Sequence, residues 1–382
     1  MSKILVINAG STSVKWRIVQ ADEVLGEGNY THKKDGGADF SFEQGGETST
    51  GFLGEVEIIP GHLLGVVSRL GVAEPVAVLH RIVHGGTEFR EVTELTPSVL
   101  EKLRALEELA PLHQPVGLGF VEAVRELQPD WTNYGVFDTA FHATLEPTDY
   151  LYALPREVST RLGIRRYGFH GISHGFVAHK IKELVPAAQQ VVSVHLGGGT
   201  SVCGILGGES KYISMGLTPE EGLLMATRSG TLPVGVVLRL LRSGLEADEI
   251  ERMVNRESGL LGLSGSSDIR EVLAREDPEA QETLEMYVTT IAQAVVHAAV
   301  RLGGLDALVF TGTIGWKSPA VREKVLGKLS FLRVHTGAGE LVETGVWRQR
   351  DPREIAVLAL EAQEEVEMVR LYGARGVVDL LE

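Results

Sequence analysis

The stretch INAGSTSVKWRIV, residues 7–19, decides how the fold of this chain is interpreted. An apolar run ends at Asn8, passes through glycine and small hydroxylated residues, and resumes as an alternating strand pattern that contains Lys15. Backbone N–H groups of a glycine-rich turn can converge on an anion, and serine or threonine hydroxyls add further donors. Glycine also lets the backbone approach a ligand closely. The stretch therefore predicts two strands joined by a hairpin, which is either an anion site or an ordinary turn.

The opening hairpin has an echo in the second half of the chain. GSTSV at residues 10–14 returns as GGTSV at residues 198–202, and each copy follows one apolar strand and leads into another. Neither copy is a P-loop, because the G-x-x-x-x-G-K-[ST] spacing and the following helix are missing, and neither opens the helix of a dinucleotide-binding motif. We therefore predict a duplicated α/β domain in which each copy offers a glycine and hydroxyl hairpin to a shared ligand.

Strand-like runs alternate with helical patterns along the chain, which is typical of an α/β protein with helices packed on mixed or parallel sheets. At 382 residues the chain also exceeds the size at which one hydrophobic core usually stops growing, so two domains are expected. The polar residues 21–56 predict exposed hairpins. The predicted strands lie within residues 3–10, 77–86, 134–141, 190–199 and 307–315, and the predicted helices within residues 98–109, 117–127 and 283–302.

Charge and cysteine content exclude several classes of function. A net charge of −15 argues against a nucleic-acid or anionic-membrane surface, although a local cationic pocket can still attract an anionic substrate. The single cysteine, Cys203, lies in an apolar strand pattern and predicts a buried, inert thiol rather than a reactive one. The N-terminus shows no signal-peptide pattern, and no apolar run approaches the roughly 18 residues that span a bilayer. We expect a cytoplasmic protein without a nucleic-acid or membrane partner.

Charged residues occur where folding alone would not ask for them. Arg81 interrupts an apolar strand, and a buried arginine usually pairs with an anion. Two arginines, one histidine and one aspartate in glycine-bounded breaks suit phosphoryl transfer, in which arginine, protonated histidine and Mg²⁺ stabilise the moving phosphoryl oxygens. This set comprises Arg81, Asp138, His170 and Arg228. The structural alternatives are core histidines at His80, His142 and His195, and a solvated face at Arg165 and Arg166.

Motifs occur in a fixed order along nearly the whole chain. They are VINAGSTSVK, HRIVHGG, LAPLHQP, FDTAFH, RRYGFHGISH, HLGGGTSV, SMGLTPEEGL, TRSG, SGLLGLSG, VFTGTIGWKSP and AQEEVEM. Together they resemble the acetate kinases, which form the acetokinase family within the sugar kinase, Hsc70 and actin superfamily. The resemblance implies two duplicated ribonuclease-H-like domains with a cleft between them, formed by residues 1–148 with 367–382 and by residues 149–366. It also implies reversible transfer from ATP to acetate, giving acetyl phosphate and ADP, with Mg²⁺ or Mn²⁺, in a homodimer.

The resemblance assigns roles to particular residues. The catalytic positions match Arg81, Asp138, His170 and Arg228, and the acyl-binding positions match Arg81, Val83, Leu112, Phe169 and Pro219. The nucleotide and phosphate positions match Ser11, Ser13, Lys15, His195, Gly197, Gly198, Gly199, Asp268, Ile269, Arg270, Thr313, Ile314 and Gly315, and the metal positions match Asn8 and Glu364. A pocket of this kind discriminates weakly by size, because one methylene is worth about 1–3 kcal/mol, so propionate is expected as a slower substrate.

The chain departs from the family pattern on the nucleotide side. Gly198 in HLGGG stands where the family has asparagine, and Thr313 in TIGWK where it has glycine. A β-branched residue at a former glycine removes space and backbone freedom together. Further departures are Trp316 and Lys317 for glutamate and asparagine, and Thr231 and Pro233 for two aspartates. We predict altered donor selectivity, with weaker use of ATP, another nucleotide, or a smaller donor such as pyrophosphate; the alternative from another class is a non-catalytic ligand-binding paralogue.

Overall fold

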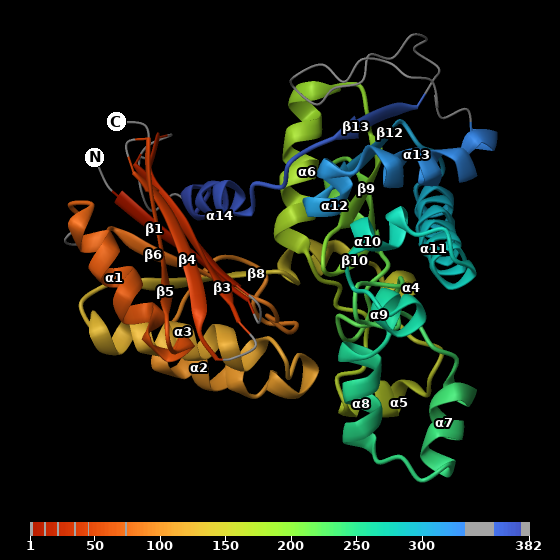
Figure 1. The fold of residues 1–382 in the computed structure, drawn as a ribbon, viewed down its shortest axis with the longest axis horizontal. Helices are drawn as coiled ribbons and strands as arrows, with labels where there is room; N and C mark the ends of the chain where they lie inside the picture. The colour runs from red at the N-terminus through yellow and green to blue at the C-terminus, as the bar shows by residue number, and fades with distance from the viewer. Residues whose placement is uncertain are drawn as a thin grey trace. The chain divides into compact units, whose positions relative to one another are not determined.

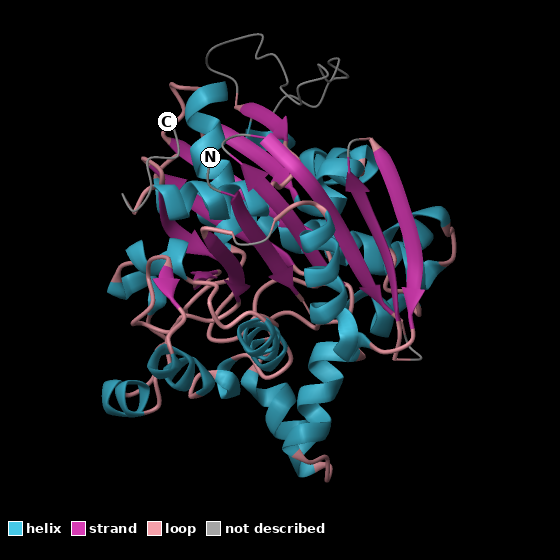
Figure 2. Cartoon of the chain, turned by 90° about the vertical axis from the view of Figure 1, so that its left-hand side faces the viewer, coloured by secondary structure: helices cyan, strands magenta, loops and turns pink. Residues whose placement is uncertain are grey.

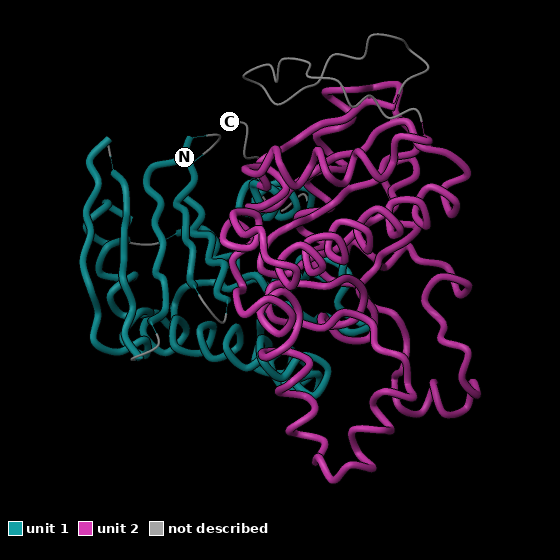
Figure 3. The backbone as a smooth tube through the Cα atoms, turned by 45° about the vertical axis from the view of Figure 1, so that its right-hand side comes forward, with its two compact units in different colours: residues 1–140, 363–382 teal, residues 141–362 magenta. Residues whose placement is uncertain are grey.

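The computed structural model describes residues 3–10, 13–20, 23–33, 36–44, 46–72, 75–332 and 355–375. The chain forms two compact units, unit 1 with residues 1–140 and 363–382, and unit 2 with residues 141–362 (Figure 3). The resemblance implies domain boundaries at 148/149 and 366/367, whereas the two compact units divide at 140/141 and 362/363. None of the described helices is long and apolar enough to cross a membrane.

Unit 1 is built on one eight-stranded sheet in the order β5-β4-β3-β2-β1-β6-β8-β7 (Figure 1). An antiparallel meander runs from β1 to β5, and β6 and β8 extend the sheet parallel to β1. The strands predicted from the polar residues 21–56 are present as β3 to β5. The strands are β1 (Lys3–Ala9), β2 (Ser13–Gln20), β3 (Glu23–His32), β4 (Ala38–Gln44), β5 (Glu47–Leu53), β6 (Ala77–Ile82), β7 (Thr93–Glu94) and β8 (Asn133–Phe137).

The helices of unit 1 cover the apolar side chains of its sheet. Leu5 and Ile7 of β1 and Trp16 of β2 share a buried cluster with Leu63 and Phe120 from two helices. The C-terminal helix α14 returns to pack on β1 and β6, so both ends of the chain build this unit. The helices are α1 (Ile59–Arg69), α2 (Pro97–Arg104), α3 (Gln114–Leu127) and α14 (Glu364–Gly373), with short 3-10 turns at Val56–Ile58, Glu107–Leu109 and Ala140–Thr144.

Unit 2 repeats the strand order of unit 1. Its sheet runs β11-β10-β9-β12-β13, with β9 antiparallel to β10, β10 antiparallel to β11, and β12 parallel to both β9 and β13. The segment β3-β2-β1-β6-β8 of unit 1 has the same order and the same directions, so the predicted duplication is confirmed at the level of topology. The strands are β9 (Gln190–Leu196), β10 (Thr200–Leu206), β11 (Glu209–Ile213), β12 (Ala307–Thr311) and β13 (Ala356–Ala359).

Helices pack on both faces of the unit 2 sheet, since α6 and α11 both contact β9. Figure 2 shows the helices and strands of the chain in different colours. Successive side chains of a strand point to opposite faces, so Val194 and Leu196 enter the core formed with α11, while His195 faces α6. The helices are α4 (Pro147–Tyr150), α5 (Arg156–Arg161), α6 (Gly171–Leu184), α7 (Val234–Arg242), α8 (Ala247–Arg256), α9 (Gly259–Ser264), α10 (Ile269–Ala274), α11 (Pro278–Leu302), α12 (Gly312–Lys317) and α13 (Pro319–Lys328), with a 3-10 turn at Ser330–Leu332.

The predicted strand within residues 307–315 is corrected at its end. Strand β12 stops at Thr311, and α12 begins at Gly312. Gly312 has a φ of 75°, and a Cβ built there would lie 2.5 Å from the carbonyl oxygen of Leu196. Only glycine tolerates both conditions. The chain can therefore turn from strand to helix directly beside the end of β9.

Candidate active site

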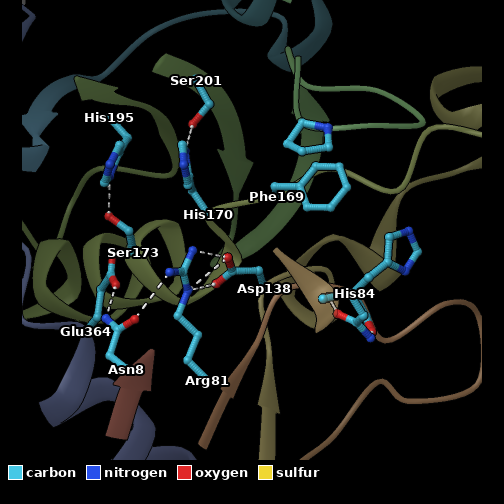
Figure 4. Close-up of polar contacts among 12 residues, drawn as sticks. Asn8, Arg81, His84, Asp138, Phe169, His170, Ser173, His195, Ser201 and Glu364 are labelled. Atoms are coloured by element: carbon cyan, nitrogen blue, oxygen red, sulfur yellow. Dashed lines mark hydrogen bonds and ion pairs between the residues drawn. The ribbon is translucent and has the colours of Figure 1, made fainter. Parts of the chain in front are cut away.

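The first cluster of site residues lies at the edge of the unit 1 sheet where three parallel strands end (Figure 4). Asn8 is near the end of β1, Arg81 is in β6, and Asp138 follows β8. The guanidinium of Arg81 donates from Nη2 to Oδ2 of Asp138 at 2.5 Å and from Nε to both carboxylate oxygens at 3.1 and 3.2 Å. Arg81 Nη1 also donates to Oδ1 of Asn8 at 3.2 Å. The guanidinium is held in one orientation from two sides.

Burial and charge act against each other in this cluster. The side chain of Asp138 is 2% exposed and that of Arg81 is 18% exposed. Burial lowers the pKa of Arg81, but the charges of Asp138 and Glu364 outweigh it and hold that pKa above its usual value. Burial raises the pKa of Asp138, and Arg81 opposes that rise. Because a buried charge is tolerated only when it is paired and hydrogen-bonded, each of the two side chains depends on the other.

Acidic side chains from α14 complete the cluster in unit 1. Asn8 Nδ2 donates to Oε2 of Glu364 at 2.9 Å and to Oε1 of Glu365 at 3.5 Å. Acidic residues in a first helical turn are favoured by the helix dipole. The described residues contain no group of three His, Cys, Asp or Glu side chains that could hold a metal by themselves. Mg²⁺ does not need one, since it binds through one or two carboxylates together with phosphate oxygens and water.

The second cluster lies on the α6 face of the unit 2 sheet. His170 precedes α6 and has a φ of 58°, the single positive φ outside glycine among the residues that the structure describes. Its Nδ1 is 2.9 Å from the hydroxyl of Ser201, and the Nδ1 of His195 is 2.8 Å from the hydroxyl of Ser173 (Figure 4). The two imidazole rings are 4.3 Å apart between centroids. A strained backbone at one residue of a polar cluster is typical of a functional site.

The glycine turn after β9 packs against this cluster. A Cβ built on Gly199 would lie 2.9 Å from Cε1 of His170, 3.0 Å from its Nε2 and 3.5 Å from Nη1 of Arg228. A side chain at residue 199 would therefore have to displace the imidazole of His170. Gly198 has no heavy atom within 4 Å of such a Cβ. The turn thus brings its backbone, His170 and Arg228 to one place in unit 2.

The predicted acyl-binding residues are divided between the units. Val83 is buried and Leu112 is half-buried in unit 1, whereas Phe169 and Pro219 are buried in unit 2. Within unit 2, Arg228 Nη1 donates to the carbonyl oxygen of Pro219 at 3.4 Å. A single pocket formed by all four residues stays a prediction.

The predicted donor residues fall into three groups. Ser11 lies outside the described residues, while Ser13 is half-buried at the start of β2 and Lys15 is exposed opposite Asn8. His195, Gly197, Gly198 and Gly199 are at the end of β9 beside Thr313, Ile314 and Gly315 in α12, because β12 pairs with β9 through Thr311 and His195. Asp268, Ile269 and Arg270 form the start of α10, where Asp268 accepts from the backbone N–H of Arg270 at 2.9 Å and binds its side chain.

Several other sequence interpretations can be compared with the structure. His80 bonds to Asn133 and His142 to Ser210, and burial lowers the pKa of each histidine to about 4, which confirms both as core histidines. Cys203 is buried, and burial raises its pKa to about 12, so the inert thiol is confirmed.

The solvated face expected for the arginine pair is wrong for Arg166. Its Nη1 donates to the carbonyls of Ile213, Ser214 and Met215, and its Nη2 binds Glu221 at 3.0 Å. Arg166 therefore fastens the segment that follows β11. A half-buried arginine that bonds to carbonyl groups has no distinct sequence pattern, so the residues alone could not reveal this role.

Sequence reasoning missed the serines of unit 2. Ser193, Ser201 and Ser173 each bond to a histidine of the α6 face. The available signal is the alternation of Ser193 and His195 along β9, which places both side chains on one face of the sheet.

Comparisons with known proteins find relatives of this chain along most of its length. The model of the acetokinase family matches residues 3–370. Acetate kinases of Geobacillus kaustophilus and Bacillus subtilis are 39% and 38% identical over 355 residues, which cover 88% of this chain and 89% of each relative. A solved propionate kinase of Francisella tularensis superposes with a TM-score of 0.89 at 30% identity, covering 97% of this chain and 99% of that one. The solved acetate kinase of Porphyromonas gingivalis has a TM-score of 0.83 at 34% identity, covering 97% and 98%.

Proposed function

The chain belongs to the acetokinase family, and we propose that it acts in the cytoplasm as an acetate kinase, transferring a phosphoryl group reversibly between ATP and acetate. The products of the forward reaction are ADP and acetyl phosphate. The observation that carries the proposal is the fixed guanidinium of Arg81, which Asp138 and Asn8 hold at the end of three parallel strands. The His170, Arg228 and glycine-turn cluster of unit 2 supplies the second part of the machinery.

The chemistry of this reaction explains why cations are needed and a general base is not. Acetate is ionised at neutral pH, since carboxyl groups of this kind titrate near pH 4. The barrier to be lowered is the repulsion between a carboxylate and a phosphoryl group, with further charge spread over the phosphoryl oxygens in the transition state. Preorganised donors stabilise that charge at little reorganisation cost. Arg81, Arg228 and His170 are donors of this type.

The donor set at Asn8 suits Mg²⁺, or Mn²⁺ in its place. Asn8 offers an amide oxygen, and Glu364 and Asp138 offer carboxylates that belong to the same hydrogen-bonded cluster. Hard oxygen ligands are those that Mg²⁺ prefers. We propose that Asn8 and Glu364 hold the metal directly or through water, with Asp138 fixing Arg81 beside them. When bound, the ion neutralises charge on the phosphate oxygens.

Propionate is the second substrate to test. The propionate kinase of Francisella tularensis superposes on this chain over 97% of its length. If Val83, Leu112, Phe169 and Pro219 enclose the acyl group, one further methylene changes the selectivity by about 1–3 kcal/mol only. We propose acetate as the preferred acceptor and propionate as a slower one.

We also propose that selectivity for the phosphoryl donor is altered in this chain. Gly198 lacks the side-chain amide that the family places there, and its surroundings are open within 4 Å. Thr313 is exposed in the first turn of α12, and Trp316 is half-buried in the same helix. Thr231 accepts from the backbone N–H of Gly222 at 3.0 Å, a contact within the loop. We propose weaker binding of ATP than in relatives with asparagine at residue 198, with pyrophosphate as the rival donor.

One assay tests the reaction and its donor together. Purified protein with Mg²⁺ is given acetate, propionate or butyrate and either ATP, another nucleotide or pyrophosphate, and the acyl phosphate is trapped with hydroxylamine. We expect acetohydroxamate with ATP. Acyl phosphate from no donor at all contradicts the proposal and favours the non-catalytic paralogue.

A matched pair of arginine variants tests Arg81. Arg81→Lys keeps a positive charge beside Asp138 but loses the two-pronged geometry, so we expect kcat/KM to fall by about a hundredfold. Arg90→Lys is the control, because Arg90 is exposed and donates to the backbone carbonyl of nearby Thr87 at 2.9 Å. Equal activities of the two variants would return Arg81 to a structural role.

The resemblance also implies a homodimer, which we propose for this chain. Helix α7 has no buried residue, and Val234, Leu238 and Leu241 are exposed on it. Light scattering on the purified protein measures the mass directly. A monomer at micromolar concentration contradicts the proposal.

A further inference from the structure

A row of alternating hydroxyl and imidazole groups lies behind His170 in unit 2. The hydroxyl of Ser201 is 2.9 Å from His170 Nδ1 and also 2.9 Å from His174 Nε2 (Figure 4 shows the first contact). The other ring nitrogen of His174, Nδ1, is 2.9 Å from the hydroxyl of Ser193. We call Ser193, His174, Ser201 and His170 the histidine–serine row. Ser193, His174 and Ser201 are fully buried, so each polar atom of these three depends on its neighbours for hydrogen bonds.

The number of N–H and O–H protons in the row limits the possible directions of its hydrogen bonds. Burial, with smaller contributions from His142 and His195, lowers the pKa of His174 well below its usual value. His174 is therefore neutral and carries one ring N–H. A serine hydroxyl donates one proton and can accept others. Every bond of the row consequently points in one direction, either from Ser193 towards His170 or from His170 towards Ser193.

The Ser193 end decides between these directions. If the row starts at Ser193, its hydroxyl donates to His174 Nδ1, and His174 Nε2–H donates to Ser201. If the row runs the other way, His174 donates to Ser193, and the hydroxyl proton of Ser193 has no acceptor within the part of the chain that the structure describes. An unsatisfied donor in a side chain with 0% exposure is unfavourable. The first direction satisfies every proton of Ser193, His174 and Ser201.

We propose that Ser201 is a positioning residue that donates its hydroxyl proton to Nδ1 of His170 and thereby keeps the proton of the neutral imidazole on Nε2. This inference rests on the proposed function for its catalytic meaning. The Nε2 edge of His170 lies beside the α-carbon of Gly199, where Arg228 Nη1 is also found. The row thus presents an N–H donor next to a guanidinium at the glycine turn. A protonated His170 would instead donate from Nδ1 to the Ser201 oxygen, which already accepts from His174 Nε2–H, and the Ser201 proton would then have no acceptor in the row. The row therefore favours the neutral donor over the cation expected from the sequence.

The tautomer can be measured without any turnover. The full chain is labelled with ¹⁵N-histidine, long-range ¹H–¹⁵N correlations are recorded at pH 8, and the His170 signals are assigned by their absence in His170→Gln. We expect the proton on Nε2 in the native chain and a mixture of tautomers in Ser201→Ala. A native His170 with its proton on Nδ1 overturns the proposal, as does an unchanged tautomer in Ser201→Ala.

Kinetics provide the second measurement, with a matched control. Ser201→Ala should lower kcat by about tenfold to a hundredfold, because it weakens the hydrogen bond from His170 Nε2–H to phosphoryl oxygens that gain charge in the transition state. The KM for acetate should change little. Ser210→Ala is the control, because it deletes a buried serine bond of 2.9 Å to another histidine, His142, outside the row. Equal losses of kcat in the two variants contradict a role for Ser201 beyond structure.

Conservative variants keep the test decisive. Ser201→Thr retains the hydroxyl and should recover most of kcat, whereas Ser201→Cys places a weak donor at the same position and should recover little. If Ser201→Ala does not fold, the comparison of Thr with Cys replaces it, and equal activities of these two variants overturn the proposal. If the native chain forms no acyl phosphate but His170 keeps its proton on Nε2, the proposed function is contradicted. The role of Ser201 in fixing the tautomer of His170 is then still supported.

Discussion

The two units use one strand order for two kinds of polar chemistry. In unit 1, Asn8 and Arg81 directly follow the paired residues Ile7 and His80. In unit 2, the corresponding register pairs His195 with Thr311. An ionic cluster thus occupies the edge in unit 1, where unit 2 carries a histidine and a buried threonine. The comparison shows that the two units keep side chains at the same place, the ends of the parallel strands, while the charge of those side chains differs.

The largest expected effect is a difference in the free energy of unfolding between variants of two ion pairs, one in each unit. Asp138→Ala leaves the Arg81 guanidinium buried without its carboxylate, and the free energy of unfolding should fall by about 3–5 kcal/mol. Asp149→Ala breaks a similar pair of hydrogen bonds with Arg301 in unit 2. The side chain of Arg301 is 33% exposed, so it can turn to water when Asp149 is removed. That loss should be about 1 kcal/mol. Urea unfolding measures both, and equal losses would remove the special status of the unit 1 pair.

Acid should lower the stability of both units, because each contains a buried, neutral histidine. Burial lowers the pKa of His80 in unit 1 and of His142 in unit 2 to about 4. Below pH 6.5 the unfolded histidines bind protons that the folded ones do not, so stability is complete above that pH and is lost as the pH falls towards 4. Each fully buried histidine contributes roughly 3 kcal/mol to that loss.

Urea unfolding at pH 7.5, 6, 5 and 4.5 checks the expected loss in acid. His80→Asn and His142→Asn should each flatten the profile by one histidine. Stability that stays constant from pH 7.5 to 4.5 in the native chain contradicts neutral, buried histidines.

A smaller effect is expected on kcat when the glycine turn of unit 2 is substituted at two neighbouring residues. Gly199→Ala places a Cβ 2.9 Å from the His170 ring, whereas Gly198→Ala meets no atom within 4 Å. We expect kcat to fall about tenfold to a hundredfold more in the first variant, since a displaced donor loses most of its transition-state interaction. Hydroxamate assays on both variants give the ratio. A ratio near one shows that the imidazole adjusts without cost.

The smallest effect concerns the donor. Gly198→Asn introduces the amide that the family resemblance implies at this position, and the open space there admits it. We expect the KM for ATP to fall by about threefold to tenfold, the worth of one neutral hydrogen bond, with the KM for acetate unchanged. A KM for ATP that stays constant or rises would place the altered donor selectivity in α12, with Trp316 and Thr313.

Much of the fold could be predicted, because the duplication leaves a visible trace. The pair GSTSV and GGTSV predicts one hairpin per unit, and β1-β2 and β9-β10 are those hairpins. The match is offset by one residue, since residues 10–13 separate the paired Ala9 and Val14, but only residues 197–199 separate Leu196 and Thr200. Loop length depends on local φ angles and contacts that five letters do not encode.

The site was predictable where a residue type is unusual for its place. Arg81 within an apolar strand predicted an anionic partner, and in the structure that partner is Asp138. The serines of the histidine–serine row were not predictable, because serine is common in strands and its role depends on which helix covers the strand. The transition into α12 was missed for a related reason, since the contact between Gly312 and Leu196 joins residues far apart in the sequence.

The return of α14 to unit 1 also sets an order of events during translation. Asn8, Arg81 and Asp138 are synthesised first, and Glu364, the hydrogen-bond acceptor for Asn8, follows 226 residues after Asp138. At about 5–20 residues per second, the growing chain exists for roughly ten to forty-five seconds with the ion pair and without this glutamate. Nascent and prematurely terminated chains therefore lack one of the proposed metal ligands. Ribosome-bound polypeptide should remain catalytically silent until Glu364 has been synthesised.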